Sequence, residues 1–169
     1  KHTREEKHSY RVSQLCGEMG SALGLSLEAI RELRTAGLMH DIGKVTIDDY
    51  LLEKSGPLAE TERLEINRHV ETGYRILSSV AEFAQIAEFV LAHHERWDGW
   101  GYPKGLKGEE IPFEARIIAI ADAYDAMTTE RPYRAALSKD EAIREIRENA
   151  GTQFDPAIAQ VFIEKVLKE

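Results

Sequence analysis

Apolar side chains recur every three to four residues along most of the chain, and this period predicts amphipathic α-helices. The expected helices cover residues 4–23, 27–40, 60–78, 81–94 and 113–128, with two more starting near 139 and at 156. Their ends carry residues that start or stop helices, namely Gly24, Ser26, Pro112, Ser138 and Pro156. No stretch alternates as a strand would, so the pattern predicts an all-α bundle of about seven helices.

The inward faces of these helices are expected to form one core. Tyr10, Leu38 and Leu64 belong to apolar stripes, and we expect them to face inward. A chain of 169 residues with 43% hydrophobic content is long enough for one well-formed core and short for two. We therefore expect residues 1–169 to form a single domain.

The segment 97–108 is the least regular part of the chain. It contains four glycines and a proline, which exclude a helix interior. Loops of this length without regular structure are commonly functional. We expect a long glycine-rich loop here, with Asp98 and Gly99 forming a turn.

Composition places the protein in a reducing compartment. Cys16 is the only cysteine, so neither a disulfide nor a sulfur-ligated zinc site is available within this chain. The sequence has no apolar run long enough to span a membrane and no signal peptide. We expect a cytoplasmic protein without a membrane segment in this chain.

The charged start, Lys1 to Lys7, lacks an initiator Met, and we expect this chain to be a piece of a longer protein.

The formal net charge of −8 argues against a DNA-binding protein, because nucleic-acid binding requires a basic surface. The same charge would repel an anionic substrate. A phosphate-binding site would therefore need metal ions, lysine or arginine concentrated locally.

His40 and Asp41 stand side by side at the inner end of the second predicted helix, followed by Gly43 and Lys44. Burying a bare carboxylate costs several kcal/mol unless it is paired or bound to a metal. Further candidate ligands are distributed over four other helices, namely His8, His69, His93, His94 and Asp122.

Each of these residues also has an ordinary structural interpretation. His69 alone fits a hydrogen-bonded core histidine, and Asp122 could pair with Arg116 or Arg131. The adjacent His93 and His94 could be a helix terminus whose charge complements the dipole. His2, in the charged start, is expected to take no part.

Together, five histidines and two acids at inward positions favour a metal site. Seven ligands are too many for one ion, and they suit two ions about 3.5–4 Å apart with a bridging carboxylate.

The ordered motifs are similar to those of the HD-GYP domains, a subgroup of the HD metal-dependent phosphohydrolases, over nearly the whole chain. They are His8-Ser-Tyr-Arg-Val, His40-Asp-Ile-Gly-Lys44, His69, His93-His-Glu-Arg-Trp-Asp-Gly-Trp-Gly-Tyr-Pro103, Asp122-Ala-Tyr-Asp-Ala-Met-Thr128, Arg131-Pro-Tyr-Arg134 and Gly151-Thr-Gln-Phe-Asp-Pro156. The resemblance implies the HD-domain fold and a phosphodiesterase that hydrolyses cyclic di-GMP to pGpG and, in some members, to GMP. It also implies an upstream regulatory domain in the full-length protein.

The resemblance further implies which residues hold each metal. His8, His40, Asp41 and Asp122 would hold one ion; His69, His93 and His94 would hold the second, with Asp41 bridging. We expect iron or manganese, and nickel, cobalt and zinc also suit imidazole and carboxylate ligands without sulfur. Some members carry a glutamate four residues before the first histidine and use it toward a third metal. That position is Arg4 here, with Glu5 and Glu6 one and two places on, so we expect two ions, although Glu5 could in principle rotate in.

Substrate-binding residues follow from the same resemblance. Lys44 and Arg131 would hold substrate phosphate, Lys44 as a point charge and Arg131 through two oxygens at once. Tyr102 could stack a guanine. Asp125 could orient a ligand or a substrate group, or be a surface acid. The catalytic group would then be Asp41, with Lys44, supporting a hydroxide held between the two ions.

Two other functions remain compatible with the sequence. An HD phosphohydrolase could act on another nucleotide, such as cyclic GMP-AMP, and product analysis would distinguish it. A non-catalytic cyclic di-GMP sensor would bind without turnover. The glycine-rich loop could approach a phosphate, stack a base through Tyr102 or Trp100, or contact a partner such as a GGDEF-domain protein. The sequence also permits a dimer.

Overall fold

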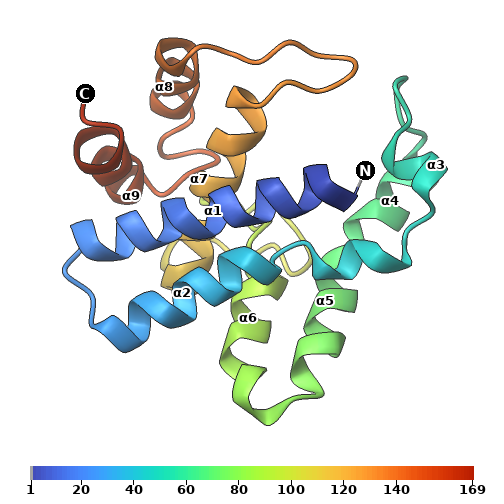
Figure 1. Ribbon diagram of the computed structural model, residues 1–169, viewed down its shortest axis with the longest axis horizontal. Coiled ribbons are helices and arrows are strands. Elements are labelled where there is room, and N and C mark those ends of the chain that lie inside the picture. The colour runs from blue at the N-terminus through green and yellow to red at the C-terminus, as the bar shows by residue number, and fades with distance from the viewer. Residues whose placement is uncertain (1) are drawn as a thin grey trace.

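The protein is all-α, as a computed structural model of the chain shows (Figure 1). Residues 2–169 are described, with side chains from residue 3, so the expectation for His2 lies outside the described side chains. The α-helices are α1 (His2–Ala22), α2 (Leu27–Met39), α3 (Asp49–Leu52), α4 (Glu60–Asn67), α5 (His69–Ser78), α6 (Ala84–Ala92), α7 (Phe113–Thr128), α8 (Lys139–Glu148) and α9 (Pro156–Val161). Short 3₁₀ segments are η1 (Ile42–Thr46), η2 (Ala81–Phe83) and η3 (Gly108–Glu110), and a π-helical turn, η4 (Phe162–Val166), follows α9.

The predicted caps start and stop these helices. The Ser26 hydroxyl accepts the Ala29 N–H at 3.1 Å, and Ser138 accepts the Glu141 N–H at 3.1 Å. Gly24, at a φ of 70°, follows α1 in the left-handed conformation that ends helices. These local signals explain why most predicted helix boundaries agree with the structure to within a few residues.

The predicted helix over 60–78 is interrupted at Arg68, which corrects the sequence expectation. The Arg68 N–H closes α4 by donating to the carbonyls of Leu64 and Glu65 at 3.2 and 3.3 Å, and α5 starts at His69. The His69 ring nitrogen Nδ1 lies at hydrogen-bond distance, 2.8 Å, from the Ile66 carbonyl oxygen. No glycine or proline marks this break, so the apolar pattern could not reveal it.

Three apolar residues expected to face inward are exposed instead. Tyr10 and Leu64 are each 56% exposed and Leu38 is 47% exposed. Helix α4, which ends at the interruption, contributes no buried residue. The core instead gathers on α1, α2, α6, α7 and the C-terminal helices.

Two helix pairs position the site. In Figure 1, α1 and α2 run in opposite directions side by side, and α5 and α6 form a second such pair below them. Helix α7 packs against α1, and η1 packs against α5. The end of α2, the start of α5 and the end of α6 therefore meet near α1 and α7. No helix within residues 2–169 is both long and apolar enough to cross a membrane.

Candidate metal centre

The structure brings together all seven residues that the sequence singled out as metal ligands. His8 comes from α1 and Asp122 from α7, whereas the other five lie at helix ends: His40, Asp41, His69, His93 and His94. Helix ends serve this purpose well because a terminal side chain can turn toward the point where several helices meet. The cluster is largely buried, with His40, His69 and His93 at most 2% exposed.

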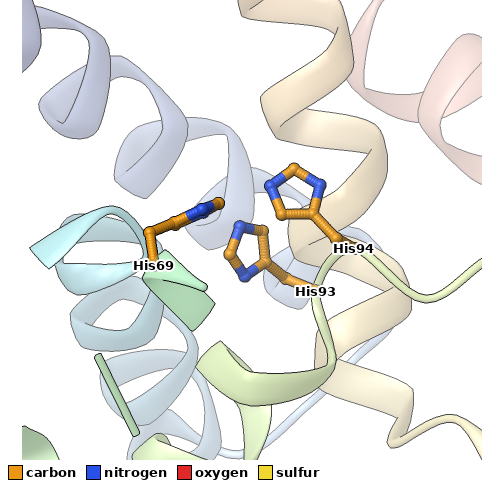
Figure 2. A group of neighbouring side chains, drawn as sticks. All are labelled: His69, His93 and His94. Carbon is orange, nitrogen blue, oxygen red and sulfur yellow. The ribbon is translucent and has the colours of Figure 1, made fainter. Parts of the chain in front are cut away.

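Potential ligand atoms within the cluster form three groups. His69, His93 and His94 form one, His8, His40 and Asp41 form another, and His40, His93 and Asp122 form a group between them. Figure 2 shows the rings of His69, His93 and His94 converging from two different helices. Within each group the ligand atoms all lie within 4.8 Å of one another. None of these groups, as found within the described residues, contains Glu5.

Asp41 faces both sides of the cluster. Its Oδ2 lies 3.2 Å from the Nε2 of His40 and 3.7 Å from that of His8, whereas its Oδ1 lies 3.5 Å from the Nε2 of His69. On the first side, Asp122 Oδ1 approaches the same His8 nitrogen at 3.0 Å. Asp41 therefore has one oxygen toward each of two ligand groups, which is the arrangement of a bridging carboxylate.

Three histidines are held with one nitrogen facing the cluster. The Nδ1 atoms of His40, His69 and His93 lie 2.7, 2.8 and 2.6 Å from the carbonyl oxygens three residues earlier. A carbonyl only accepts, so in the neutral form of each ring Nδ1 carries the proton and Nε2 keeps its lone pair, the form in which a histidine binds a metal. These Nε2 atoms are buried and have no hydrogen-bond partner among residues 2–169. Buried unpaired acceptors facing two carboxylates fit divalent cations.

His8 is oriented by a different device. Its Nδ1 lies 2.6 Å from Asp125 Oδ2, and Arg11 donates to both oxygens of that carboxylate at 2.6 and 3.1 Å. Asp125 is only 4% exposed, so the surface-acid interpretation is wrong. The structure places it behind His8, which leaves the predicted contact with substrate unsupported by its position. Arg11, three residues after His8 on the same helix, had no predicted role.

The cluster contains two electrostatic halves. Burial alone would lower the pKa of His8, but hydrogen bonds to Asp122 and Asp125 raise it to about 9. Burial also opposes charge on His40, yet the Asp41 and Asp122 carboxylates raise its pKa. In the other half, burial lowers the pKa of His94 to about 4. The part of the cluster that contains Asp41 and Asp122 thus attracts positive charge. In the other part, the histidines stay neutral and can act as metal ligands.

The ordinary pairings considered for Asp122 are absent among the described residues. Arg116 instead donates to Asp155 at 2.7 Å and to the Ile111 carbonyl at 3.0 Å. Asp155 also caps α9 by accepting the Ala157 N–H at 2.9 Å. Arg116 therefore ties α7 to α9, and Asp122 keeps its carboxylate for the histidines.

Two predicted phosphate-binding side chains line one cavity beside the cluster. Lys44, Arg131 and His8 border a cavity of about 320 Å³. Lys44 Nζ lies 3.1 Å from Asp41 Oδ2, which links the cation to the cluster. Tyr102 lies elsewhere, stacked on the His94 ring with centroids 5.1 Å apart. One face of the Tyr102 ring is therefore occupied by a protein side chain, and the predicted stacking of guanine could use only the other face.

The glycine-rich loop is organised by Glu95, for which the sequence suggested no role. This buried carboxylate accepts the Lys104 N–H at 2.9 Å and the Leu106 N–H at 3.0 Å. Tyr102 N–H also donates to the His94 carbonyl. The predicted turn is present: Asp98 accepts the Trp100 N–H at 3.1 Å. Glu95 thus fixes the loop against the end of α6, next to His93 and His94.

Replacing Glu95 with Gln is expected to loosen this loop. Glutamine offers one acceptor oxygen and presents an NH₂ group to the second backbone N–H, leaving a buried donor unpaired. We expect a loss of about 1–3 kcal/mol in unfolding free energy and faster hydrogen exchange at the amides of residues 104 and 106. Glu109→Gln, at an exposed position of η3 directly after the loop, is the matched control. Unchanged exchange at those amides would show that Glu95 does not hold the loop.

Comparison with known proteins agrees with this geometry. The family model described as "HD domain" matches residues 1–158, and the chain belongs to this family. A "Cyclic di-GMP phosphodiesterase" of Thermotoga maritima is 42% identical over 165 residues, covering 96% of this chain and 45% of its own length. A "3'3'-cGAMP-specific phosphodiesterase 1" of Vibrio cholerae is 42% identical over 141 residues, which cover 83% of this chain and 33% of that protein.

A solved structure shares the fold. An HDG"Y"P protein from Bdellovibrio bacteriovorus superimposes with a TM-score of 0.78 at 20% identity, covering 98% of this chain and 53% of that one. The HD-domain fold predicted from the motifs is thereby confirmed. The chain spans less than half the length of the two curated relatives.

Proposed function

We propose that this domain is a metal-dependent phosphodiesterase that hydrolyses cyclic di-GMP to linear pGpG, with GMP as a further product. The observation that carries the proposal is Asp41, whose two oxygens face two groups of buried histidines. The names of the relatives support a cyclic dinucleotide as the substrate class. Cyclic GMP-AMP is the alternative substrate, favoured by the name of the Vibrio relative.

Two divalent ions are the cofactors we propose, iron or manganese by preference. His8, His40, Asp41 and Asp122 would hold one, and His69, His93 and His94 the other. Bound there, the ions would supply Lewis-acid stabilisation of the phosphoryl oxygens and activate the attacking water. The intact set of ligands disfavours a purely sensory domain, which would not require it.

The remaining side chains bind and orient the reacting groups. Lys44 and Arg131 border the cavity beside the cluster and would hold the non-bridging oxygens of the scissile phosphate. Asp125, fixed by Arg11, holds the His8 ring in one orientation. Tyr102 stacks on one face of the His94 ring, and Glu95 fixes the loop that carries Tyr102.

Interactions beyond the substrate are also proposed. Trp100 is 86% exposed on the glycine-rich loop, where it could contact a GGDEF-domain protein. The relatives' greater length supports an upstream regulatory domain in the full-length protein, which we propose to be cytoplasmic. A dimer is compatible with these features.

Replacing Arg131 with Ala is expected to weaken substrate binding and leave the metals in place. Arg131 borders the cavity but belongs to none of the three ligand groups. We expect KM for cyclic di-GMP to rise about 10- to 100-fold, because the substrate loses one charged hydrogen-bonding partner. Arg144→Ala, at an exposed position on α8, is the control. Loss of bound metal from the Arg131 variant would show that this role is assigned wrongly.

The proposed activity is tested by separating the products formed from cyclic di-GMP and from 3'3'-cyclic GMP-AMP. Appearance of pGpG from cyclic di-GMP at the higher kcat/KM supports the main proposal. Faster turnover of cyclic GMP-AMP would establish the alternative. Binding of cyclic di-GMP without any product would identify a sensor instead.

A further inference from the structure

A second, largely apolar cavity of about 540 Å³ lies on the other side of Lys44. Its apolar lining comes from the end of α2, from η1 and from α3, namely Leu38, Met39, Ile42, Val45 and Leu52. Val45 is 75% exposed and Leu38 47% exposed. Single exposed apolar side chains are ordinary, but several around one concave surface next to polar groups are typical of a ligand pocket.

The apolar cavity adjoins the proposed phosphate site. It shares Glu5, Lys44 and Leu52 with the 320 Å³ cavity that contains Arg131, and it also touches Asp41. One cavity is therefore bordered by cations and the other by hydrocarbon, with Lys44 between them. A nucleotide has the same two parts, an anionic phosphate and a flat, largely apolar base.

Acidic side chains also line the apolar cavity. Glu5 and Glu6 both border it from α1. Glu5 also borders the cationic cavity. Glu5 therefore also lies on the side of Lys44 where Arg131 borders the cationic cavity. Glu6 borders the apolar cavity and not the cationic one, and so does Asp49, which already has an interaction partner within the chain. This leaves Glu6 as the candidate partner for a base.

A carboxylate is a selective partner for guanine. The guanine Watson–Crick edge presents two adjacent donors, N1–H and the N2 amino group, and one carboxylate can accept from both. Adenine presents an acceptor, N1, at the corresponding position, where a carboxylate would repel it. A site that hydrogen-bonds specific donors strongly rejects analogues that lack them.

We infer that the apolar cavity binds one guanine base of the substrate and that Glu6 selects guanine over adenine. This inference rests on the proposed function, because it places the base beside the phosphate that Lys44 holds. It assigns the hydrocarbon lining to the faces of the base and the Glu6 carboxylate to its edge.

The inference is tested by binding of GMP and AMP, which carry the same phosphate and differ only in the base. Calorimetry should show GMP binding about 10- to 100-fold more tightly than AMP. Glu6→Gln replaces one acceptor oxygen by an NH₂ donor and should reduce this preference to a few-fold. Glu18→Gln is the matched control: it is exposed on the same helix, roughly 18 Å further along its axis, and should keep the full preference.

A second variant tests the cavity itself. Val45→Asp places a charge in the hydrocarbon lining at an exposed position, where folding should tolerate it, and should weaken binding of both nucleotides about tenfold. Equal binding of GMP and AMP to the unmodified protein, or an unchanged preference in the Glu6 variant, would overturn the inference. Failure of the proposed function is separate, since preference for GMP without hydrolysis of cyclic di-GMP would refute only the catalytic proposal.

Discussion

Replacing Asp41 with Ala is expected to abolish hydrolysis of cyclic di-GMP and to remove much of the bound metal. The side chain is 8% exposed, and its two oxygens face His40 on one side and His69 on the other. Without it, neither ion would have a shared anionic ligand, and several kcal/mol of transition-state stabilisation would be lost. We expect kcat to fall by about 10³-fold or more, measured alongside metal content by elemental analysis.

The matched control for Asp41 is Asp140→Ala, an exposed aspartate on α8. Its metal content and turnover should resemble those of the unmodified protein. Circular dichroism would establish that the Asp41 variant is folded. Turnover at the unmodified rate by a folded Asp41→Ala protein would contradict the two-metal scheme.

Replacing Gly43 with Ala is expected to disrupt both the fold and the site. A Cβ at this position would overlap the His69 carbonyl oxygen and would lie 2.7 Å from the Gly73 nitrogen. Backbone atoms cannot give way as a flexible side chain can, so η1 would have to move off α5. We expect a loss of about 1–3 kcal/mol in unfolding free energy, measured by denaturant titration. Separation of Asp41 from His69 should also weaken metal binding.

Gly56→Ala provides the control for that substitution, because a Cβ at Gly56 would meet no atom within 4 Å. This variant should keep its stability and its metals. If Gly43→Ala were as stable as the control and bound metal equally well, the close approach of η1 and α5 would not position the site.

The sequence predicted the members of the cluster better than their arrangement. Adjacent His40 and Asp41 after an apolar helix, with further histidines and Asp122 on inward faces or at helix ends, sufficed to predict which residues come together, because an unpaired buried carboxylate is costly. The sequence could not show the break at Arg68, which no glycine or proline marks, nor that Leu64 on the preceding helix is exposed. That break also places His69 at the start of α5.

The supporting residues were the least predictable part of the site. Asp125 had two interpretations because its exposure depends on how α7 packs against α1, and Arg11 acts on it across 114 residues. Glu95 stands next to His94 in the sequence, yet its partners are backbone amides of a loop that no periodicity describes. Contacts of this kind depend on tertiary structure and carry little signal in a single sequence.

The most direct test of a two-metal phosphodiesterase is a titration of anaerobically purified, metal-free protein with Fe(II) or Mn(II). Bound metal per chain and hydrolysis of cyclic di-GMP are measured at each step. Hydrolysis is expected to remain low with one ion bound and to reach its maximum at about two ions per chain, the number that a bridging carboxylate supports. Full activity with one ion or none, or the failure of either metal to bind, would contradict this account.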